Sequence, residues 1–298
     1  MKLSLRWLLP VSLLALTAFL PLPASTFSSF VSFNGANGSH PTGMVVGGDG
    51  TVYGATYQGG PYGLGTVWKI SPAGVITRLV SFNGKNGSFP AYTSSGLIVG
   101  GDGAVYGSTT RGGANDQGTI WKISPAGVFT TLFSFTGANG GDPDSGLVLG
   151  RDGAIYGTTR FGGTKGLGTV WKLSPEGVFT SLVSFVGPNG NRPGSCVLGN
   201  DGAIYGTTVR GGTKDLGTLW KISPAGVFTS LVSFTGANGS GPSLSRLVVG
   251  GDGSVYGTTS EGGSKDLGTI WKVSPAGVAS LTSTPSALDG PAFVTVIV

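Results

Sequence analysis

The chain has 298 residues, of which 57 are glycine, while charged residues make up 10% and hydrophobic residues 39%. This balance excludes a disordered chain, and the glycines, which follow no Gly-X-Y period, exclude collagen and argue against long helices. The formal net charge of +5 comes from scattered Lys and Arg residues without a basic cluster, so a nucleic-acid partner is not expected.

Residues 1–24 have the pattern of a cleaved signal peptide. Lys2 and Arg6 precede an apolar run from Trp7 to Leu20, and Leu22-Pro23-Ala24 offers a small residue at a cleavage position. A retained membrane anchor is the alternative, but the run is short for a membrane span. We therefore expect a secreted, extracytoplasmic protein whose mature chain has no stable membrane span.

A unit of about fifty residues then occurs five times in tandem. Each copy contains Asp-Gly-x-(Val/Ile)-Tyr-Gly, then Gly-Thr-(Val/Ile/Leu)-Trp-Lys, then Ser-Pro-x-Gly. A Ser-Phe pair leads into each Gly-x-Asn-Gly-x-x-Pro loop. The repeated tryptophans are Trp68, Trp121, Trp171, Trp220 and Trp271.

Each unit is predicted to contain four strands, as the third shows. Residues 146–150 form a continuous apolar run, typical of a strand covered on both faces. An Asp-Gly turn leads to a second strand at 154–159, and a glycine-rich loop to a third at 169–173. After a Pro-Glu-Gly turn, residues 178–185 alternate apolar and polar side chains, as in a half-exposed outer strand.

This order predicts an all-β fold, a β-propeller of five four-stranded blades over residues 25–282. The repeated Trp and Phe side chains are expected to fill the space between adjacent blades. Residues 27–33 are expected to pair beside the strand at 269–273 and close the ring. Residues 283–298 are left as a C-terminal tail, either an edge strand or the start of a truncated further domain.

The combined motif DGxVYGTT…GG…GTVWKxSPxGVxTxLxSF resembles the GloVer tandem repeat over roughly residues 27–282. That repeat occurs in exported bacterial proteins often grouped as choice-of-anchor proteins. The resemblance implies a β-propeller-like exported protein. It implies no biochemical activity, and the anchoring segment common in the family is not evident here.

The residues needed for most catalytic centres are scarce. His40 is the single histidine and Cys196 the single cysteine, so no Ser-His-Asp triad, zinc site or internal disulfide is expected. Cys196 lies in an apolar run and is interpreted as a small buried residue. The recurring Asp-Gly residues are interpreted as turn formers whose Asp side chains pair weakly with the Lys after each Trp. No metal and no cofactor is expected.

Differences between the units concentrate at a few positions. Length varies only between the loop proline and the next Asp-Gly turn, and residue type varies just before the Gly-Gly pair and just before the loop proline. In an up-and-down blade these loops share one face, here called the divergent face, while the Asp-Gly and Ser-Pro turns lie on the other, the uniform face. Variable loops on a constant framework are where binding sites usually occur.

The candidate ligand-binding residues are aromatic and Arg side chains of the divergent face, which suit sugar stacking and carboxylate pairing. They are Tyr57, Phe89, Tyr92, Arg111, Arg160, Phe161 and Arg210. Tyr92 is the foremost candidate because it lies in the longest insertion, residues 91–96.

The sequence thus predicts an extracellular, non-catalytic, monomeric repeat protein that binds a glycan or a cell-envelope component on the divergent face. One alternative is a polysaccharide-active enzyme that uses the loop carboxylates Asp142, Asp144 and Glu261. Another is a structural spacer whose surface differences reflect drift.

Overall fold

The structure is a computed structural model that describes residues 29, 31–91, 96–242, 247–277 and 279–283. The chain divides into two compact bodies, Met1–Ser32 and Phe33–Val298. The described residues of the larger body form strands, turns and loops, and each of its five sequence repeats is called a unit.

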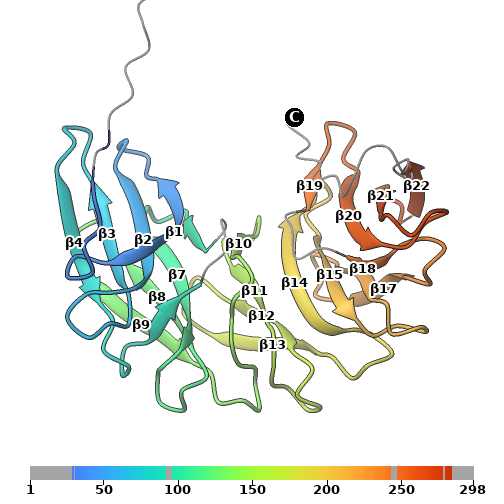
Figure 1. Cartoon of the computed structure of the whole chain (residues 1–298), viewed down its shortest axis with the longest axis horizontal. Coiled ribbons are helices and arrows are strands. Elements are labelled where there is room, and N and C mark those ends of the chain that lie inside the picture. Colours follow the sequence, from blue (N-terminus) through green and yellow to red (C-terminus); the bar gives the residue numbers. More distant parts are fainter. Residues whose placement is uncertain (1–28, 30, 92–95, 243–246, 278, 284–298) are drawn as a thin grey trace, which may run out of the picture. The chain divides into compact units, whose positions relative to one another are not determined.

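The strands form five antiparallel sheets, which follow one another in chain order (Figure 1). The first sheet contains β1 (Ser39–Val46), β2 (Val52–Gln58), β3 (Thr66–Ile70) and β4 (Ile76–Ser81). The second contains β5 (Ser88–Pro90), β6 (Leu97–Val99), β7 (Val105–Arg111), β8 (Thr119–Ile123) and β9 (Phe129–Ser134). The third contains β10 (Val148–Leu149), β11 (Ile155–Thr159), β12 (Thr169–Leu173) and β13 (Phe179–Ser184). The fourth contains β14 (Asn191–Leu198), β15 (Ile204–Arg210), β16 (Thr218–Ile222) and β17 (Phe228–Ser233). The fifth contains β18 (Ser240–Pro242), β19 (Val248–Val249), β20 (Val255–Glu261), β21 (Thr269–Val273) and β22 (Ala279–Ser283).

The predicted four-stranded units are therefore confirmed, with one refinement at the innermost strand. β1 and β14 are continuous but shift register, between Pro41 and Met44 and between Pro193 and Cys196. In the second and fifth sheets two short segments pair with the same neighbour, β5 and β6 with β7, and β18 and β19 with β20. The extra residues of the longer insertions fall at this irregular point.

The repeated tryptophans are buried and pack beside a glycine of the neighbouring strand. A Cβ atom built on Gly54, Gly107, Gly157, Gly206 or Gly257 would lie 2.1–2.4 Å from the indole ring. The glycine of the Tyr-Gly motif is thus needed because the indole of the next strand occupies the volume of a side chain. The two motifs of each repeat therefore pack together, because the glycine that ends Asp-Gly-x-(Val/Ile)-Tyr-Gly leaves room for the indole of Gly-Thr-x-Trp-Lys.

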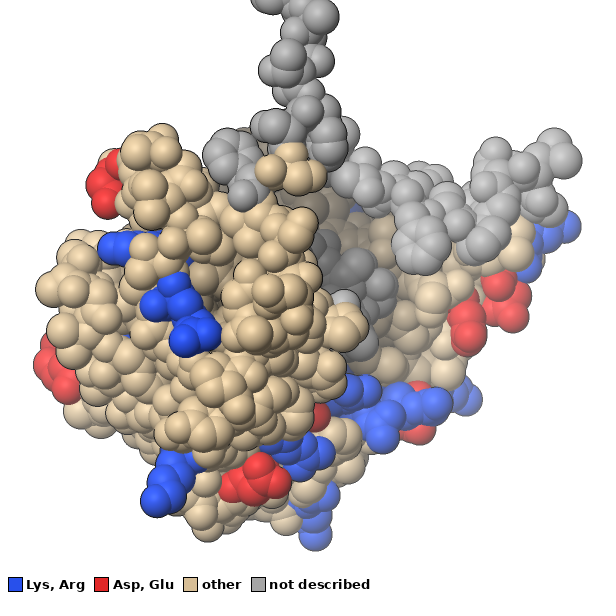
Figure 2. Space-filling view, turned by 60° about the vertical axis from the view of Figure 1, so that its left-hand side comes forward, with Lys and Arg blue, Asp and Glu red and all other residues tan. Residues whose placement is uncertain are grey.

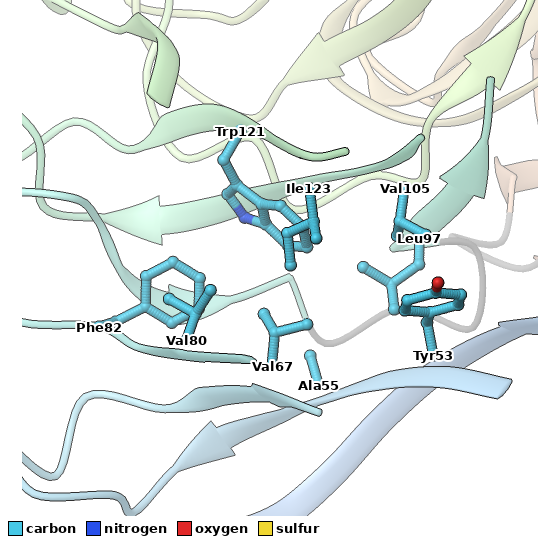
Figure 3. Packing of buried hydrophobic residues seen from close by; sticks show 9 residues of the cluster. All are labelled: Tyr53, Ala55, Val67, Val80, Phe82, Leu97, Val105, Trp121 and Ile123. Atoms are coloured by element: carbon cyan, nitrogen blue, oxygen red, sulfur yellow. The ribbon is translucent and has the colours of Figure 1, made fainter. Parts of the chain in front are cut away.

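Each buried hydrophobic cluster joins one sheet to the next. In Figure 3, side chains of the first sheet and the loop after it, among them Ala55, Val67 and Phe82, face Leu97 and Trp121 of the second sheet. Equivalent clusters join the second sheet to the third, the third to the fourth and the fourth to the fifth. The prediction that the repeated Trp and Phe side chains fill the space between units is confirmed.

The prediction that residues 27–33 pair beside the strand at 269–273 is wrong. β21 has β20 on one side and β22 on the other, so both of its edges are occupied by the chain's own fifth unit. Residues 29 and 31–33 form no strand, and the ring of Phe33 lies 5.9 Å from that of Trp68 in the first unit. The last unit lacks the usual Phe, but strand pairing uses backbone groups and does not require that side chain.

The two terminal sheets expose positions that are buried elsewhere. Met44 is 63% exposed, whereas Leu97, Leu147 and Leu247, which occupy the same place in their units, are 3–6% exposed. Ile270 in the fifth sheet is half-buried, while its counterparts in the other units are fully buried. Within the described ranges, no buried cluster joins the fifth sheet to the first.

The uniform face carries one Asp–Tyr–Lys cluster in each of the second to fifth units. Lys122 Nζ lies 2.6 Å from Asp102 Oδ2, and the Tyr106 hydroxyl donates to the same oxygen at 3.0 Å. The Lys–Asp distances in the other three clusters are 2.7 or 2.8 Å. The expected pairing of the turn aspartates with the lysines is confirmed in these units.

These clusters predict an acid-sensitive stability. The hydrogen bond from Lys272 lowers the pKa of Asp252 from 3.8 to about 2, so the stabilisation is present above pH 3.8 and is lost as the pH falls toward 2. We expect the Tm to fall over this range, and Lys272→Met to make that fall smaller, because the Asp252 pKa then lies closer to its unfolded value. Thermal unfolding from pH 5 to 2 checks this. Identical profiles for the two proteins would contradict it, and the two profiles should converge below pH 2.

Candidate functional site

The residue before the loop proline lies at the junction between units. The N–H groups of Phe89, Asp142 and Arg192 donate to carbonyl oxygens of the preceding unit at 2.8, 3.0 and 3.0 Å. The acceptors are Leu64, Gln117 and Leu167, the residues just before each Gly-Thr pair. These bonds fix the backbone of the divergent residue at every described junction, so its side chain extends from a rigid point of the framework.

This backbone position is unfavourable for most side chains. The φ angles are 54° at His40, 55° at Phe89, 57° at Asp142 and 54° at Arg192, in the left-handed region. The equivalent residue of the fifth unit is Gly241, with φ 55°, so glycine fits the same conformation. A non-glycine residue there costs about 1–2 kcal/mol. Residues with a strained backbone persist mainly where they serve a function, which marks this position as a candidate functional position.

Side chains from three consecutive units line a cleft of about 470 Å³ on the divergent face. The first unit contributes Tyr57, at the end of β2. The second contributes residues of β5 and β7, and the third contributes the loop before β10 and the residue after β11. The lining residues are Tyr57, Phe89, Thr110, Arg111, Asp142, Asp144 and Arg160. The structure thus brings together four of the seven predicted ligand-binding residues.

An aromatic pair forms one wall of this cleft. The rings of Tyr57 and Phe89 lie 5.2 Å apart, centroid to centroid, at an interplanar angle of 33°. Both residues are half-buried. A partly exposed aromatic surface of this kind suits an apolar face of a ligand, such as a sugar ring.

Opposite charges meet at the other wall. Partial burial raises the pKa of Asp142, and the nearby negative charge of Asp144 raises it further, while Arg111 and Arg160 act in the opposite direction. In the part of the chain that the structure describes, neither arginine forms an ion pair with a carboxylate. Figure 2 shows that most of the surface in view is uncharged.

A second, smaller cleft of about 100 Å³ continues toward the fourth unit. It shares Asp144 and Arg160 with the first cleft and adds, among others, Arg192, Ser195 and Val209. The guanidinium carbons of Arg160 and Arg192 both lie 5.6 Å from the ring centre of Phe161. The aromatic ring of Phe161 therefore helps to hold two arginines beside the cleft.

The remaining predicted residues do not line these two clefts. Phe161 lies beside the smaller cleft as described, and Arg210 forms an exposed ion pair with Asp215 at 3.7 Å. Tyr92 lies outside the described residues. Of the carboxylates proposed for catalysis, Asp142 and Asp144 line the larger cleft together, whereas Glu261 lines neither cleft.

Arg192 and Thr110 belong to the site but were not among the sequence candidates. Arg192 occupies the divergent position before the loop proline, the same position that identified Phe89, so the signal was present in the repeat alignment. Thr110 is nearly buried and donates its hydroxyl to the Phe89 carbonyl at 3.1 Å, which holds the strained residue in place.

The isolated His and Cys residues lie apart from the clefts. His40 is exposed, with Nδ1 3.3 Å from the Ser39 hydroxyl. Cys196 packs against the core between the third and fourth sheets, and burial raises its thiol pKa to about 12. Among the described residues, no three His, Cys, Asp or Glu side chains are grouped to hold a metal ion. In the same residues, no helix is long and apolar enough to span a membrane.

One protein-family model matches this chain, described as the Gloeobacter/Verrucomicrobia repeat, over residues 18–195 and 145–296. The predicted resemblance to the GloVer repeat is thereby confirmed. No curated protein matches the chain.

Solved structures share the fold. Virginiamycin B lyase from Staphylococcus aureus is 19% identical with a TM-score of 0.53, covering 84% of this chain and 71% of the lyase. A gluconolactonase from Xanthomonas campestris is 13% identical with a TM-score of 0.51, covering 83% and 76%. The extracellular domain of a hybrid two-component system from B. thetaiotaomicron is 13% identical with a TM-score of 0.53, covering 84% and 28%. At these identities the likeness shows an all-β, propeller-like fold.

Proposed function

The chain belongs to the Gloeobacter/Verrucomicrobia repeat family, and we propose that it is an extracellular, non-catalytic protein that binds a glycan in the larger cleft of the divergent face. The observation that carries this proposal is the composition of that cleft. An aromatic pair, two arginines and two aspartates converge there from three units.

Each group has a role in sugar recognition. The Tyr57–Phe89 pair offers a surface for the C–H face of a sugar ring. Arg111 and Arg160 can donate paired hydrogen bonds to ligand oxygens, and the aspartates can accept hydrogen bonds from hydroxyl groups. The inter-unit hydrogen bonds hold the strained residues Phe89 and Asp142 in place before a ligand arrives, which reduces the entropy lost on binding.

The extracellular location is part of the proposal. It is supported by the signal-peptide pattern of residues 1–24, which lie outside the described residues, and by the extracellular domain among the structures of similar fold.

A glycan array probed with the protein tests the proposal. We expect a selective set of glycans to bind, and Tyr57→Ala and Phe89→Ala each to weaken binding at least about fivefold, since a lost stacking contact costs on the order of 1 kcal/mol or more. Phe89→Gly should also remove binding while keeping or raising the Tm, because Gly241 shows that glycine fits this conformation. Absence of binding to every glycan would favour the spacer alternative.

A polysaccharide-active enzyme is the second candidate, and one observation favours it. Asp142 has a raised pKa beside Asp144, the environment in which one carboxyl can act as an acid and the other as a base. Incubation with the glycans that bind, followed by measurement of new reducing ends, separates the two functions. Product formation that is abolished by Asp142→Asn would replace the binding proposal with the enzyme.

We also propose that the five units close into a ring as a monomer, with the fifth sheet packed face to face against the first. Met44 is exposed and Ile270 is half-buried, whereas Leu97, Leu147 and Leu247 at the position of Met44 and the counterparts of Ile270 in the other units are buried. His40 and Leu267 occupy the positions of Phe89 and Leu64 in their units. In a closed ring the N–H of His40 would therefore donate to the carbonyl of Leu267, as Phe89 donates to Leu64. No strand exchange by residues 27–33 is required for this closure.

Hydrogen exchange of the His40 amide tests the closure. In a monomer, which ultracentrifugation verifies, we expect this amide to exchange as slowly as those of Phe89, Asp142 and Arg192. Fast exchange in the monomer would mean an open row of sheets. Protection that appears only with dimer formation would instead mean that the first sheet of one molecule covers the fifth of another.

A further inference from the structure

We infer that the ligand is an acidic polysaccharide, whose carboxylate-bearing sugars lie along both clefts against Arg111, Arg160 and Arg192. This inference rests on the proposed function, because it names the class of glycan that the same face would bind. It requires more than the larger cleft, since the ligand must be extended and negatively charged.

The two clefts are adjacent, because Asp144 and Arg160 line both of them. The path proposed for the ligand passes through one and then the other. The path runs from Tyr57 in the first unit to Val209 in the fourth. A single sugar ring would occupy only part of the larger cleft, at about 470 Å³, because cavities of this size hold ligands of several rings. The geometry therefore favours a chain of sugars over a monosaccharide.

Arginines recur along this path, one from each of the second, third and fourth units. Arg111, Arg160 and Arg192 are exposed, and none of them is ion-paired to a carboxylate within the described ranges. Arg210 differs, because it forms an exposed ion pair with Asp215 at 3.7 Å. A ligand with carboxylates at repeated intervals would pair with these arginines in a bidentate manner, which neutral glycans cannot do.

The aspartates restrict the ligand further. Asp142 and Asp144 lie among the arginines, and a densely charged polyanion such as a nucleic acid would be repelled there. A polysaccharide presents hydroxyl groups between its carboxylates, and these can donate to the aspartates. The mixture of charges on this path thus matches a polymer in which acidic and hydroxyl groups alternate along the chain.

Carboxylated oligosaccharides and their methyl esters provide the test. The probes are galacturonate and mannuronate oligomers of three and six sugars, each with its fully methyl-esterified form, measured by titration calorimetry. We expect at least one acidic hexamer to bind tenfold or more tightly than its ester, and more tightly than the trimer. Arg111→Ala, Arg160→Ala and Arg192→Ala combined should bring the acid-to-ester ratio close to one. Lys122→Ala, Lys172→Ala and Lys221→Ala combined on the uniform face should leave the ratio unchanged.

The outcomes separate this inference from the proposed function. Equal affinity for acid and ester, or binding of neutral array glycans without any acidic oligomer, would overturn the acidic class while the glycan-binding proposal stands. Equal affinity for trimer and hexamer would overturn the extended path. Failure of every glycan, acidic or neutral, would overturn both.

Discussion

Replacing Trp171 by Ala is expected to lower the free energy of unfolding by about 3–5 kcal/mol, the range for removing a large aromatic side chain from a core. Trp171 is fully buried and belongs to the cluster that joins the second sheet to the third, with the ring of Phe135 6.0 Å away. The substitution leaves a cavity between two units, and neither sheet can collapse into it without breaking strand pairing. Reversible denaturant unfolding, monitored by circular dichroism, measures the loss.

Trp171→Phe is the matched control. The buried indole Nε1 of Trp171 has no hydrogen-bond partner among the described residues, so replacing it by Phe removes volume but no hydrogen bond. The loss should therefore be clearly smaller than for Ala. A loss near zero for Ala, or an equal loss for Phe and Ala, would show that the indole does not fill the space between units.

Replacing Gly107 by Ala is expected to destabilise the protein by about 1–3 kcal/mol, the usual range for overpacking a core. The added Cβ would lie 2.1 Å from Cζ2 of Trp121, which is fully buried and cannot move aside without disturbing the second unit. The direction is opposite to the ordinary effect of replacing Gly by Ala in a strand, which is slightly favourable. The midpoint of denaturant unfolding provides the measurement.

Gly101→Ala is the control in the same unit, because a Cβ atom there would meet nothing within 4 Å. We expect little or no change at Gly101. In a Trp121→Phe background the cost of Gly107→Ala should shrink, since the atom that causes the clash is gone. Equal effects at Gly101 and Gly107 would mean that the Tyr-Gly glycine is retained for backbone reasons and not for the indole.

The four-stranded unit could be predicted because it is local. Turn residues, strand periodicity and the Trp of each unit lie within about fifty residues, and five copies of the same pattern reinforce one another. The role of the Tyr-Gly glycine could not be predicted, because it depends on how two strands face each other across a hairpin. The pairing of β22 with β21 was missed because residues 27–33 were expected beside that strand, although the fifth unit's own last strand supplies the backbone groups that antiparallel pairing needs.

The sequence could predict only part of the candidate site, because only some of its features are local to one unit. Repeat differences singled out the position before the loop proline, but which of those residues meet depends on contacts between units. Tyr57 and Phe89 are in different units, as are Arg111 and Arg160, and only the packing of three sheets brings them to one cleft. The left-handed backbone at Phe89 was likewise invisible, since residues before proline usually adopt extended conformations.

The central claim is that the ligand binds on the divergent face, and a comparison of two triple variants tests it most directly. Tyr57→Ala, Phe89→Ala and Arg111→Ala combined alter one cleft, while Lys122→Ala, Lys172→Ala and Lys221→Ala combined alter the uniform face, on β8, β12 and β16. For a glycan identified by array, titration calorimetry should show that the first triple abolishes binding and that the second leaves Kd within about twofold of the unmodified protein. Loss of binding in the second triple, with binding retained in the first, would place the site on the uniform face and contradict the account.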